Sequence, residues 1–201
     1  MFITCLDMEG VVTPEIWIAF AEESGIPELK ITTREEPDYD KLMKYRIDIL
    51  RAHKLGIREI RETISRVDPL PGAKEFLHEL RSFSQVIIVS DTFTQFAGPL
   101  MEKLDRPTLF CNELIIGEDG MITDYALRCA GTKLTTVQSL QHMGFDTIAA
   151  GDSLNDLGML KASSLGVLFR STEEIKKAHP ELPNTDSYQE LMALIKGKMG
   201  L

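Results

Sequence analysis

Four short polar motifs occur in this chain in a fixed order. Asp7 and Glu9 follow a first apolar run, and Ser90 ends a second one. Lys133 opens a segment with helical periodicity, and the motif Gly151-Asp152-Ser153-Leu154-Asn155-Asp156 ends a third apolar run. Carboxylates, a hydroxyl and a lysine are the groups that can hold a divalent cation and a transferring phosphoryl group. The combination therefore predicts a magnesium-dependent phosphoryl-transfer site.

The first motif contains the two acids that such chemistry needs. A carboxylate held at the end of a rigid strand can attack phosphorus and form an aspartyl-phosphate, which divides one difficult displacement into two easier ones. Asp7 is the candidate nucleophile. Glu9, two residues later, is the candidate general acid and base, because it can protonate the leaving oxygen and then deprotonate the incoming water. Gly10 permits the sharp turn that brings the backbone close to a phosphate.

Mg2+ is the expected cofactor, since it binds hard oxygen ligands and few of them need to come from protein. Asp7 and Asp152 would supply carboxylates, and the backbone carbonyl of Glu9 is a third candidate ligand. Ser90 and Lys133 would donate hydrogen bonds and positive charge to the phosphoryl oxygens.

Each motif also has a structural alternative. A single acid or Ser90 at a strand end can be a helix cap, and Lys133 alone can be a surface lysine. The segment 152–156 is more specific, because its crowded acids and amide favour a bound cation. The ordered set at matching strand ends favours the phosphoryl-transfer interpretation over the purely structural one.

An α/β fold would bring these motifs together. The three apolar runs are Phe2–Leu6, Val86–Val89 and Thr147–Ala150. Amphipathic helical patterns separate them, which is typical of buried parallel strands in a doubly wound, mostly parallel sheet. Ligands of such sheets bind beyond the carboxyl ends of the strands, near a topological switch point. We therefore expect Asp7, Ser90 and Asp152 to converge.

A helical insertion should follow the first strand. The expected helices are Pro14–Ser24, Asp38–His53 and Ile57–Val67, with a polar loop at 32–39 and a rigid turn at Pro69–Gly72. The pattern predicts a catalytic core of residues 1–13 and 70–201 and a small helical cap of residues 14–69.

The remaining core should continue the alternation of helices and strands. The expected helices are Ala73–Phe83, Gln95–Leu104, Thr132–His142, Asn155–Ala162 and Ser187–Lys198, and the expected strands are Thr108–Cys111 and Gly166–Phe169. Glu113–Gly117 and Met121–Tyr125 flank a turn and predict a β-hairpin that decorates the edge of the sheet.

Composition narrows the partners. The chain has 201 residues and a formal net charge of −9, which argues against binding to nucleic acid or to an acidic membrane surface. Its three cysteines, Cys5, Cys111 and Cys129, have no metal-ligand spacing, so we expect reduced thiols in a cytoplasmic protein. No signal peptide or membrane span is visible. The sequence leaves open whether the protein forms a homodimer.

The sequence resembles the haloacid dehalogenase-like phosphohydrolases over essentially its whole length. The segments that carry the resemblance are DMEGV, PEIWIAFAE, MKYRIDIL, VSDTF and GDSLND. Within that superfamily the chain is most similar to the phosphoserine phosphatases, especially the branch that also transfers the phosphoryl group to homoserine. The resemblance implies a Rossmann-like core with a helical cap after the first strand, a Mg2+ cofactor, and a small phosphorylated amino acid as substrate. Hydrolysis of L-phosphoserine through an aspartyl-phosphate, with homoserine as a further acceptor, is the implied activity.

The resemblance also implies a role for each matching residue. Asp7 corresponds to the nucleophile, Glu9 to the general acid and base, and Asp152 to a metal ligand. Glu15 and Arg46 correspond to the residues that bind the amino and carboxylate groups of phosphoserine, which suits their charges. Ser90, Asp91, Lys133 and Asn155 correspond to phosphate- and substrate-contacting residues, and Asp156 to a group that orients Lys133 or a metal-bound water. Without the resemblance, Glu15 would be a helix N-terminal charge and Arg46 an exposed helix residue.

Two features of the sequence depart from the family pattern. Most relatives carry Asp at the position of Glu9, so hydrolysis could be slow relative to transfer to an alcohol. Ser90-Asp91-Thr92 stands where ordinary phosphoserine phosphatases commonly have small glycines, which could shape the choice of acceptor.

Two other functions compete with phosphoserine hydrolysis. One is a phosphatase for another small metabolite, such as a sugar phosphate or nucleotide, and the other is a regulatory binder of phosphorylated metabolites.

Overall fold

A seven-stranded sheet forms the centre of the computed structural model, which describes residues 1–32, 35–36 and 38–201. The strands are β1 (Phe2–Leu6), β2 (Gln85–Phe93), β3 (Thr108–Ile116), β4 (Ile122–Ala126), β5 (Asp146–Gly151), β6 (Leu165–Phe169) and β7 (Asn184–Thr185), in the order β4-β3-β2-β1-β5-β6-β7. Neighbouring strands run parallel, except that β4 is antiparallel to β3. The predicted α/β class and mostly parallel sheet are confirmed.

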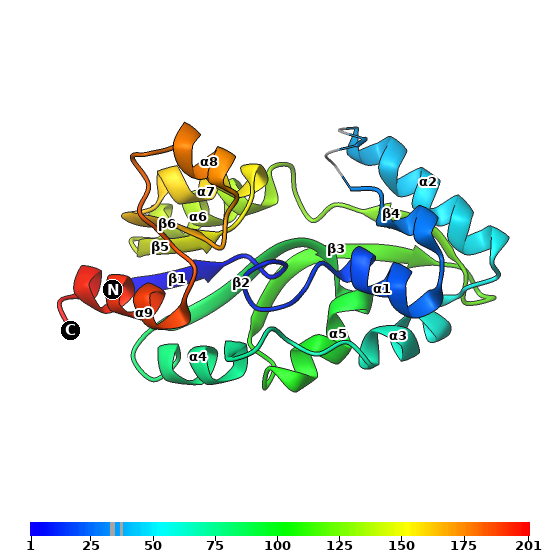
Figure 1. The fold of residues 1–201 in the computed structure, drawn as a ribbon, viewed down its shortest axis with the longest axis horizontal. Coiled ribbons are helices and arrows are strands. Elements are labelled where there is room, and N and C mark those ends of the chain that lie inside the picture. The colour runs from blue at the N-terminus through cyan, green and yellow to red at the C-terminus, as the bar shows by residue number, and fades with distance from the viewer. Residues whose placement is uncertain (33–34, 37) are drawn as a thin grey trace.

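Helices cover both faces of this sheet (Figure 1). One face carries α4 (Ala73–Leu80), α5 (Thr94–Lys103) and α9 (Tyr188–Met199), and the other carries α6 (Thr132–His142), α7 (Leu157–Ala162) and α8 (Glu173–Ala178). The buried apolar side chains accordingly form two clusters, one under each layer of helices. No described helix combines the length and the apolar character that a membrane span requires.

The central strand β1 lies between β2 and β5, where the chain reverses its direction of winding. Leu6 is paired with Ile88 on one side and with Ala150 on the other. Because the three strands are parallel and in this register, the residues that follow them leave the sheet at one edge. The topological switch point of the sheet therefore lies where the sequence predicts it.

Strand β2 is longer than the apolar run Val86–Val89 that predicts it. It continues to Phe93, and its pairing with β3 changes register between Val89 and Phe93. Ser90 thus lies within an irregular part of the strand and not after its end. A register change of this kind redirects side chains locally, as β-bulges commonly do beside active sites.

The hairpin of β3 and β4 is present, but it is more than an edge decoration. The ring of Tyr125, on β4, packs edge-on against the ring of Tyr39, with the centroids 5.7 Å apart. The Tyr125 hydroxyl donates to Asp40 Oδ1 at 3.0 Å. At the other end of the hairpin, the Ile57 amide donates to the Gly120 carbonyl at 2.9 Å. The hairpin therefore supports helices α2 (Tyr39–Ala52) and α3 (Ile57–Ser65), an arrangement that no local pattern predicts.

The inserted helices lie beyond the end toward which β1 points (Figure 1). They are α1 (Ile16–Ser24), η1 (Pro27–Lys30), α2 (Tyr39–Ala52) and α3 (Ile57–Ser65). Three helices are confirmed close to their expected bounds, and η1 was not predicted. Asp38 caps α2, since its side chain accepts hydrogen bonds from the Asp40 and Lys41 amides. Part of the expected loop at 32–39, namely Thr33, Arg34 and Pro37, lies outside the described residues.

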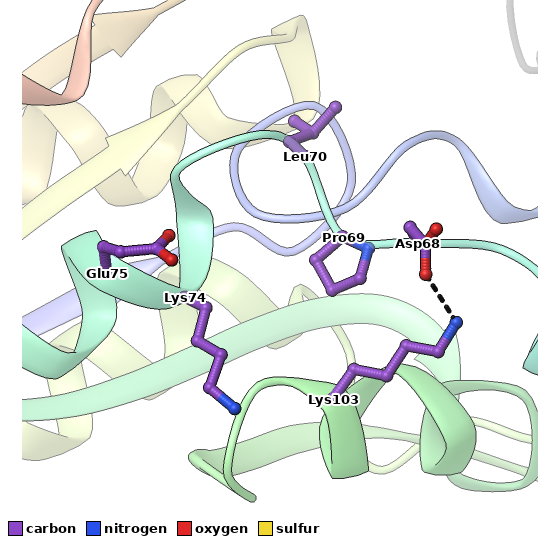
Figure 2. Close-up of a pocket in the computed structure, with 6 residues that line it drawn as sticks. All are labelled: Asp68, Pro69, Leu70, Lys74, Glu75 and Lys103. Carbon is purple, nitrogen blue, oxygen red and sulfur yellow. Dashed lines mark hydrogen bonds and ion pairs between the residues drawn. The ribbon is translucent and has the colours of Figure 1, made fainter.

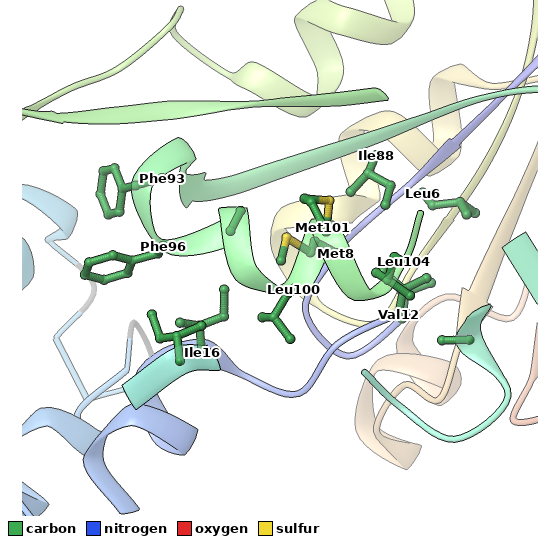
Figure 3. Packing of buried hydrophobic residues seen from close by; sticks show 14 of the residues in the cluster. Leu6, Met8, Val12, Ile16, Ile88, Phe93, Phe96, Leu100, Met101 and Leu104 are labelled. Atoms are coloured by element: carbon green, nitrogen blue, oxygen red, sulfur yellow. The ribbon is translucent and has the colours of Figure 1, made fainter. Parts of the chain in front are cut away.

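Aromatic packing joins the insertion to the core. Phe96 on α5 is fully buried, and its ring lies 5.0 Å from that of Trp17 on α1 and 5.9 Å from that of Phe93. Figure 3 shows Phe96 beside Phe93 and Ile16, in the cluster that continues to Met8 and Leu100. Edge-to-face aromatic pairs stabilise a contact beyond the area that they bury.

Replacing Phe96 by alanine should therefore destabilise the protein strongly. Loss of a fully buried ring leaves a cavity, so we expect Phe96→Ala to lower the free energy of unfolding by about 3–5 kcal/mol in urea denaturation. The control is Met143→Ala, since Met143 is 71% exposed and its loss should change stability by less than about 0.5 kcal/mol. Equal effects of the two substitutions would contradict this packing.

Candidate active site

Three carboxylates meet at the carboxyl edge of the sheet. Asp7 follows β1, and Asp152 and Asp156 follow β5. One oxygen from each lies within 4.8 Å of the others. The Asp7 amide donates to the Ala150 carbonyl at 2.9 Å, so the strand pairing continues up to the cluster. The predicted convergence of Asp7 and Asp152 is confirmed, and Asp156 joins them.

Lys133, the second residue of α6, neutralises part of this charge. Its Nζ lies 2.9 Å from Asp7 Oδ1 and 2.7 Å from Asp156 Oδ1, and its side chain is 4% exposed. Burial alone would lower the pKa of Lys133, but Asp156 and Asp7 raise it above its usual value. The two carboxylates therefore favour the charged ammonium, and the alternative of a surface lysine is wrong.

Asp156 is a structural anchor as well as an acid. It is fully buried, and its Oδ2 accepts hydrogen bonds from the amides of Asp152 and Ser153, both at 3.0 Å. With Oδ1 on Lys133, both of its oxygens have partners. The chain forms a single 3-10 turn, η2 (Leu154–Asp156), before α7 begins, so the expected single helix from Asn155 is divided in two.

The cluster carries more negative than positive charge. Burial and the neighbouring Asp156 raise the pKa of Asp7 well above its usual range, and burial, Asp156 and Glu15 raise the pKa of Asp152 to about 6. A divalent cation would relieve this repulsion, and carboxylate oxygens are the ligands that Mg2+ prefers. Asp7 and Asp152 therefore fit the predicted metal site.

Gly10 allows the loop after β1 to pass against Asp152. Its φ is +75°, and a Cβ there would lie 2.5 Å from Asp152 Oδ2. The loop is closed by hydrogen bonds from the Gly10 amide to Thr13 O at 2.8 Å and from the Val12 amide to Met8 O at 2.9 Å. Any side chain at this position would be strained and would displace the Asp152 carboxylate.

Glu9 points toward the first inserted helix. Its Oε2 accepts a hydrogen bond from the Ile16 amide at 3.3 Å, at the start of α1. Burial raises the pKa of Glu9 well above its usual range, and the adjacent Glu15 raises it further. Glu15 itself is exposed at the N-cap of α1. The structure thus brings these two predicted site residues together, while metal binding by the Glu9 carbonyl stays a prediction.

Arg46 is buried, so the alternative of an exposed helix residue is wrong. Its guanidinium carbon lies 4.4 Å from the centroid of the Trp17 ring, and its Nη2 donates to Ile31 O at 2.7 Å. Burial lowers the pKa of Arg46 to about 10, although Glu9 acts in the opposite direction. Its buried Nε has no hydrogen-bond partner in the described part of the chain. An orphaned donor on a buried cation is expensive unless a ligand satisfies it.

Asp91 is held from three sides. Its Oδ2 accepts from Asn155 Nδ2 at 3.0 Å, which brings two predicted site residues together. Its carbonyl accepts from Asn112 Nδ2 at 3.0 Å and from Tyr39 Oη at 3.2 Å. Ser90, next to it, is buried.

Sequence reasoning missed three supporting residues. Asn112 and Tyr39 hold Asp91, and Ser171 donates to the Asp152 carbonyl at 2.5 Å. Asn112 follows the apolar run 108–111, the same signal that identifies Asp7, and Ser171 follows β6 closely. These two could have been found. Nothing in the local pattern distinguishes Tyr39 from an ordinary first-turn residue of a helix.

A surface hollow elsewhere on the molecule is separate from this site (Figure 2). It lies around the turn before α4, and Asp68, Pro69, Leu70, Lys74, Glu75 and Lys103 line it. Its lysines already have acidic partners, since Lys103 contacts Asp68 at 2.7 Å and Lys74 contacts Asp105 at 2.9 Å. None of the carboxylates described above borders it.

Comparison with known families agrees with this geometry. The family model described as haloacid dehalogenase-like hydrolase matches residues 18–161. The chain belongs to this family. A relative of this hydrolase, the phosphoserine phosphatase ThrH of Pseudomonas aeruginosa, is 46% identical over 191 residues, which cover 95% of the present chain and 93% of the relative. The phosphoserine phosphatase of Methanocaldococcus jannaschii is 26% identical and covers 88% of each chain.

Solved structures have the same fold as this haloacid dehalogenase-like hydrolase. A substrate-bound phosphoserine phosphatase superposes with a TM-score of 0.78 at 22% identity, and covers 96% of the present chain and 97% of its own. A phospho-aspartyl intermediate analogue of phosphoserine phosphatase superposes with a TM-score of 0.77, also at 22% identity, with the same coverage. At this identity the likeness establishes the fold alone.

The close approach of Gly10 to Asp152 yields a metal-binding prediction. Gly10→Ala should weaken Mg2+ binding by about 10- to 100-fold in isothermal titration calorimetry, because the methyl group would displace the Asp152 carboxylate. The matched control is Gly144→Ala, since Gly144 also has a positive φ, +88°, but has no atom within 4 Å of its added Cβ. If the two substitutions weakened Mg2+ binding equally, the strain of a non-glycine residue at positive φ would explain the loss. The contact with Asp152 would then not be its cause.

Proposed function

We propose that this hydrolase removes the phosphoryl group of L-phosphoserine through an aspartyl-phosphate on Asp7. The observation that carries the proposal is that the two oxygens of the Asp7 carboxylate differ in their contacts. Lys133 Nζ and the Met8 amide both contact Oδ1, at 2.9 and 2.7 Å, and no donor among the described residues contacts Oδ2. One oxygen is thus held and the other is left for attack on phosphorus, as nucleophilic catalysis requires.

The chemistry divides into two displacements. Asp7 Oδ2 attacks phosphorus, the bond between phosphorus and the serine oxygen breaks, and Glu9 gives its proton to that oxygen. Its raised pKa favours the protonated form that this step needs. Glu9 then takes a proton from water, whose oxygen attacks the phosphorus of the aspartyl-phosphate. Inorganic phosphate leaves, and the Asp7 carboxylate is restored.

Positive groups around the phosphoryl oxygens would stabilise both displacements. Lys133 is fixed beside Asp7, and Ser90 lies buried on the neighbouring strand. Mg2+ held by Asp7, Asp152 and the Glu9 carbonyl would supply further charge neutralisation at the phosphoryl group when bound. Asp156 helps to keep Lys133 in position, since its Oδ1 lies 2.7 Å from the Lys133 ammonium.

The inserted helices would recognise the amino acid part of the substrate. The orphaned Nε of Arg46 supports a role in binding the phosphoserine carboxylate, because a guanidinium holds a carboxylate with two hydrogen bonds. Exposed Glu15, beside Glu9, would bind the ammonium group. Asp91 and Asn155, which hydrogen-bond each other, would complete the substrate site. The names of the two relatives support phosphoserine as the substrate.

Transfer to homoserine is the second candidate activity. It is favoured by Glu9, whose side chain reaches the Ile16 amide of α1 and so depends on the inserted helices. An acid tied to that helix could activate water poorly and leave the aspartyl-phosphate available to an alcohol.

In this proposal residues 14–69 form the cap and residues 1–13 and 70–201 form the core. The protein acts in the cytoplasm.

The direct test is phosphate release from L-phosphoserine with Mg2+. Wild type should release phosphate, and Asp7→Asn should abolish release, because an amide cannot form the acyl-phosphate. Arg46→Lys should raise KM for phosphoserine by about 10-fold or more, yet leave p-nitrophenyl phosphate hydrolysis nearly unchanged, since it loses the two-pronged contact alone.

The other outcomes identify the competing functions. Hydrolysis of sugar phosphates or nucleotides with phosphoserine inert would indicate a phosphatase for another metabolite. Binding of phosphoserine without any acyl-phosphate in rapid acid quench would indicate a regulatory binder. In either case the proposed substrate or activity is wrong, although the family is unchanged.

Glu9 should also control the partition between water and homoserine. With homoserine present, we expect Glu9→Asp to lower the ratio of O-phosphohomoserine to inorganic phosphate, because the shorter acid loses its contact with the Ile16 amide. The two products can be followed by phosphorus NMR with L-phosphoserine as donor. An unchanged ratio of the two products would show that the length of the acid at position 9 does not control the choice of acceptor.

A further inference from the structure

The peptide bond between Asp91 and Thr92 is held on both sides. Its carbonyl oxygen accepts from Asn112 Nδ2 at 3.0 Å and from Tyr39 Oη at 3.2 Å. Its amide, on Thr92, donates to Ser90 Oγ at 3.2 Å. In a planar trans peptide the C=O and N–H point in opposite directions, so whatever fixes the carbonyl also fixes the amide.

The contact with the Thr92 amide determines how the Ser90 hydroxyl can act. A hydroxyl has one proton and two lone pairs. Because Ser90 Oγ accepts the Thr92 N–H, it keeps its own proton free to donate, and no other partner of this oxygen occurs among the described residues. Ser90 is 2% exposed, so bulk water does not compete freely for that proton. The hydroxyl is thus prepared as a donor.

Tyr39 brings this arrangement under the influence of the inserted helices. It is the first residue of α2, whereas Asn112 lies on β3 of the core. The ring of Tyr39 is fixed edge-on against Tyr125, at 5.7 Å and 86°. Burial and the nearby Asp91 raise the pKa of the Tyr39 hydroxyl, which therefore keeps its proton and donates.

We propose that Tyr39 is a positioning residue that couples the inserted helices to the Ser90 hydroxyl through the Asp91–Thr92 peptide. With Tyr39 in place, the peptide cannot rotate and Ser90 presents its proton to a phosphoryl oxygen. Displacing α2 from the sheet would remove one of the two donors on the Asp91 carbonyl and leave the Ser90 donor less well directed. Coupling of this kind is reciprocal, so phosphoryl binding would in turn favour the position that α2 has in this structure. The inference rests on the proposed function, in which Ser90 binds phosphoryl oxygens.

A double-mutant cycle tests the coupling. Tyr39→Phe removes only the hydroxyl, and we expect it to lower kcat/KM for L-phosphoserine and the affinity for inorganic phosphate with Mg2+ by about 3- to 10-fold each. In a Ser90→Ala background the same substitution should have little further effect, because Tyr39 acts through Ser90. Tyr45→Phe is the matched control. It removes a hydroxyl from the same helix, at a residue that is 40% exposed, and should change both quantities less than 2-fold.

Each result has a definite meaning. Losses from Tyr39→Phe and Ser90→Ala that multiply in the double variant overturn the proposal, as does a Tyr39→Phe enzyme with unchanged phosphate affinity. Phosphate affinity measured by calorimetry does not depend on the leaving group of a substrate. The cycle therefore remains decisive even if wild type fails to hydrolyse phosphoserine. That failure would overturn the proposed function alone. If wild type binds no phosphate, both proposals fail. Thermal unfolding of Tyr39→Phe within about 2 °C of wild type would confirm that the variant is folded.

Discussion

The balance of buried charge at the carboxyl edge of the sheet constrains the rest of this structure. Asp7, Asp152 and Asp156 come within 4.8 Å of one another, and Lys133 contacts two of them. Removing one partner from a buried ion pair leaves an uncompensated charge, at a cost of about 3–5 kcal/mol. Strands β1 and β5 and helix α6 therefore have to keep their relative positions closely. The same excess of negative charge creates the demand for a cation.

The two parts of the chain contribute different chemistry to this edge. The sheet and its helices carry the carboxylates and the lysine that would act on a phosphoryl group. The insertion carries Arg46 and Glu15, whose charges suit the ends of an amino acid, and Trp17 supports Arg46 by stacking under its guanidinium. Glu9 and Tyr39 connect the parts, one from the core to the Ile16 amide and the other from α2 to the Asp91 carbonyl. These two contacts join the insertion to the edge of the sheet that carries the carboxylates.

The β3–β4 hairpin supports this link from outside the site. Its Tyr125 packs against Tyr39, and its Gly120 carbonyl accepts the Ile57 amide of α3. A Cβ on Gly56 would lie 2.9 Å from that carbonyl, so the insertion approaches the hairpin too closely for a side chain at this position. An element that looks peripheral in the sheet order thus stabilises the helices that would close over the substrate.

The sequence alone determined the fold class, the three central strands, the inserted helices and the convergence of Asp7 with Asp152. These follow from local periodicity and from the geometry of parallel sheets, where polar residues at strand ends must meet. Only the tertiary structure decided that β2 continues through Ser90, that Arg46 is buried on Trp17, and that Tyr39 and Asn112 share the Asp91 carbonyl. Those features depend on pairs of residues up to 52 positions apart. Periodicity within a window reports which face of an element is apolar, but it carries no information on which distant polar group that face will meet.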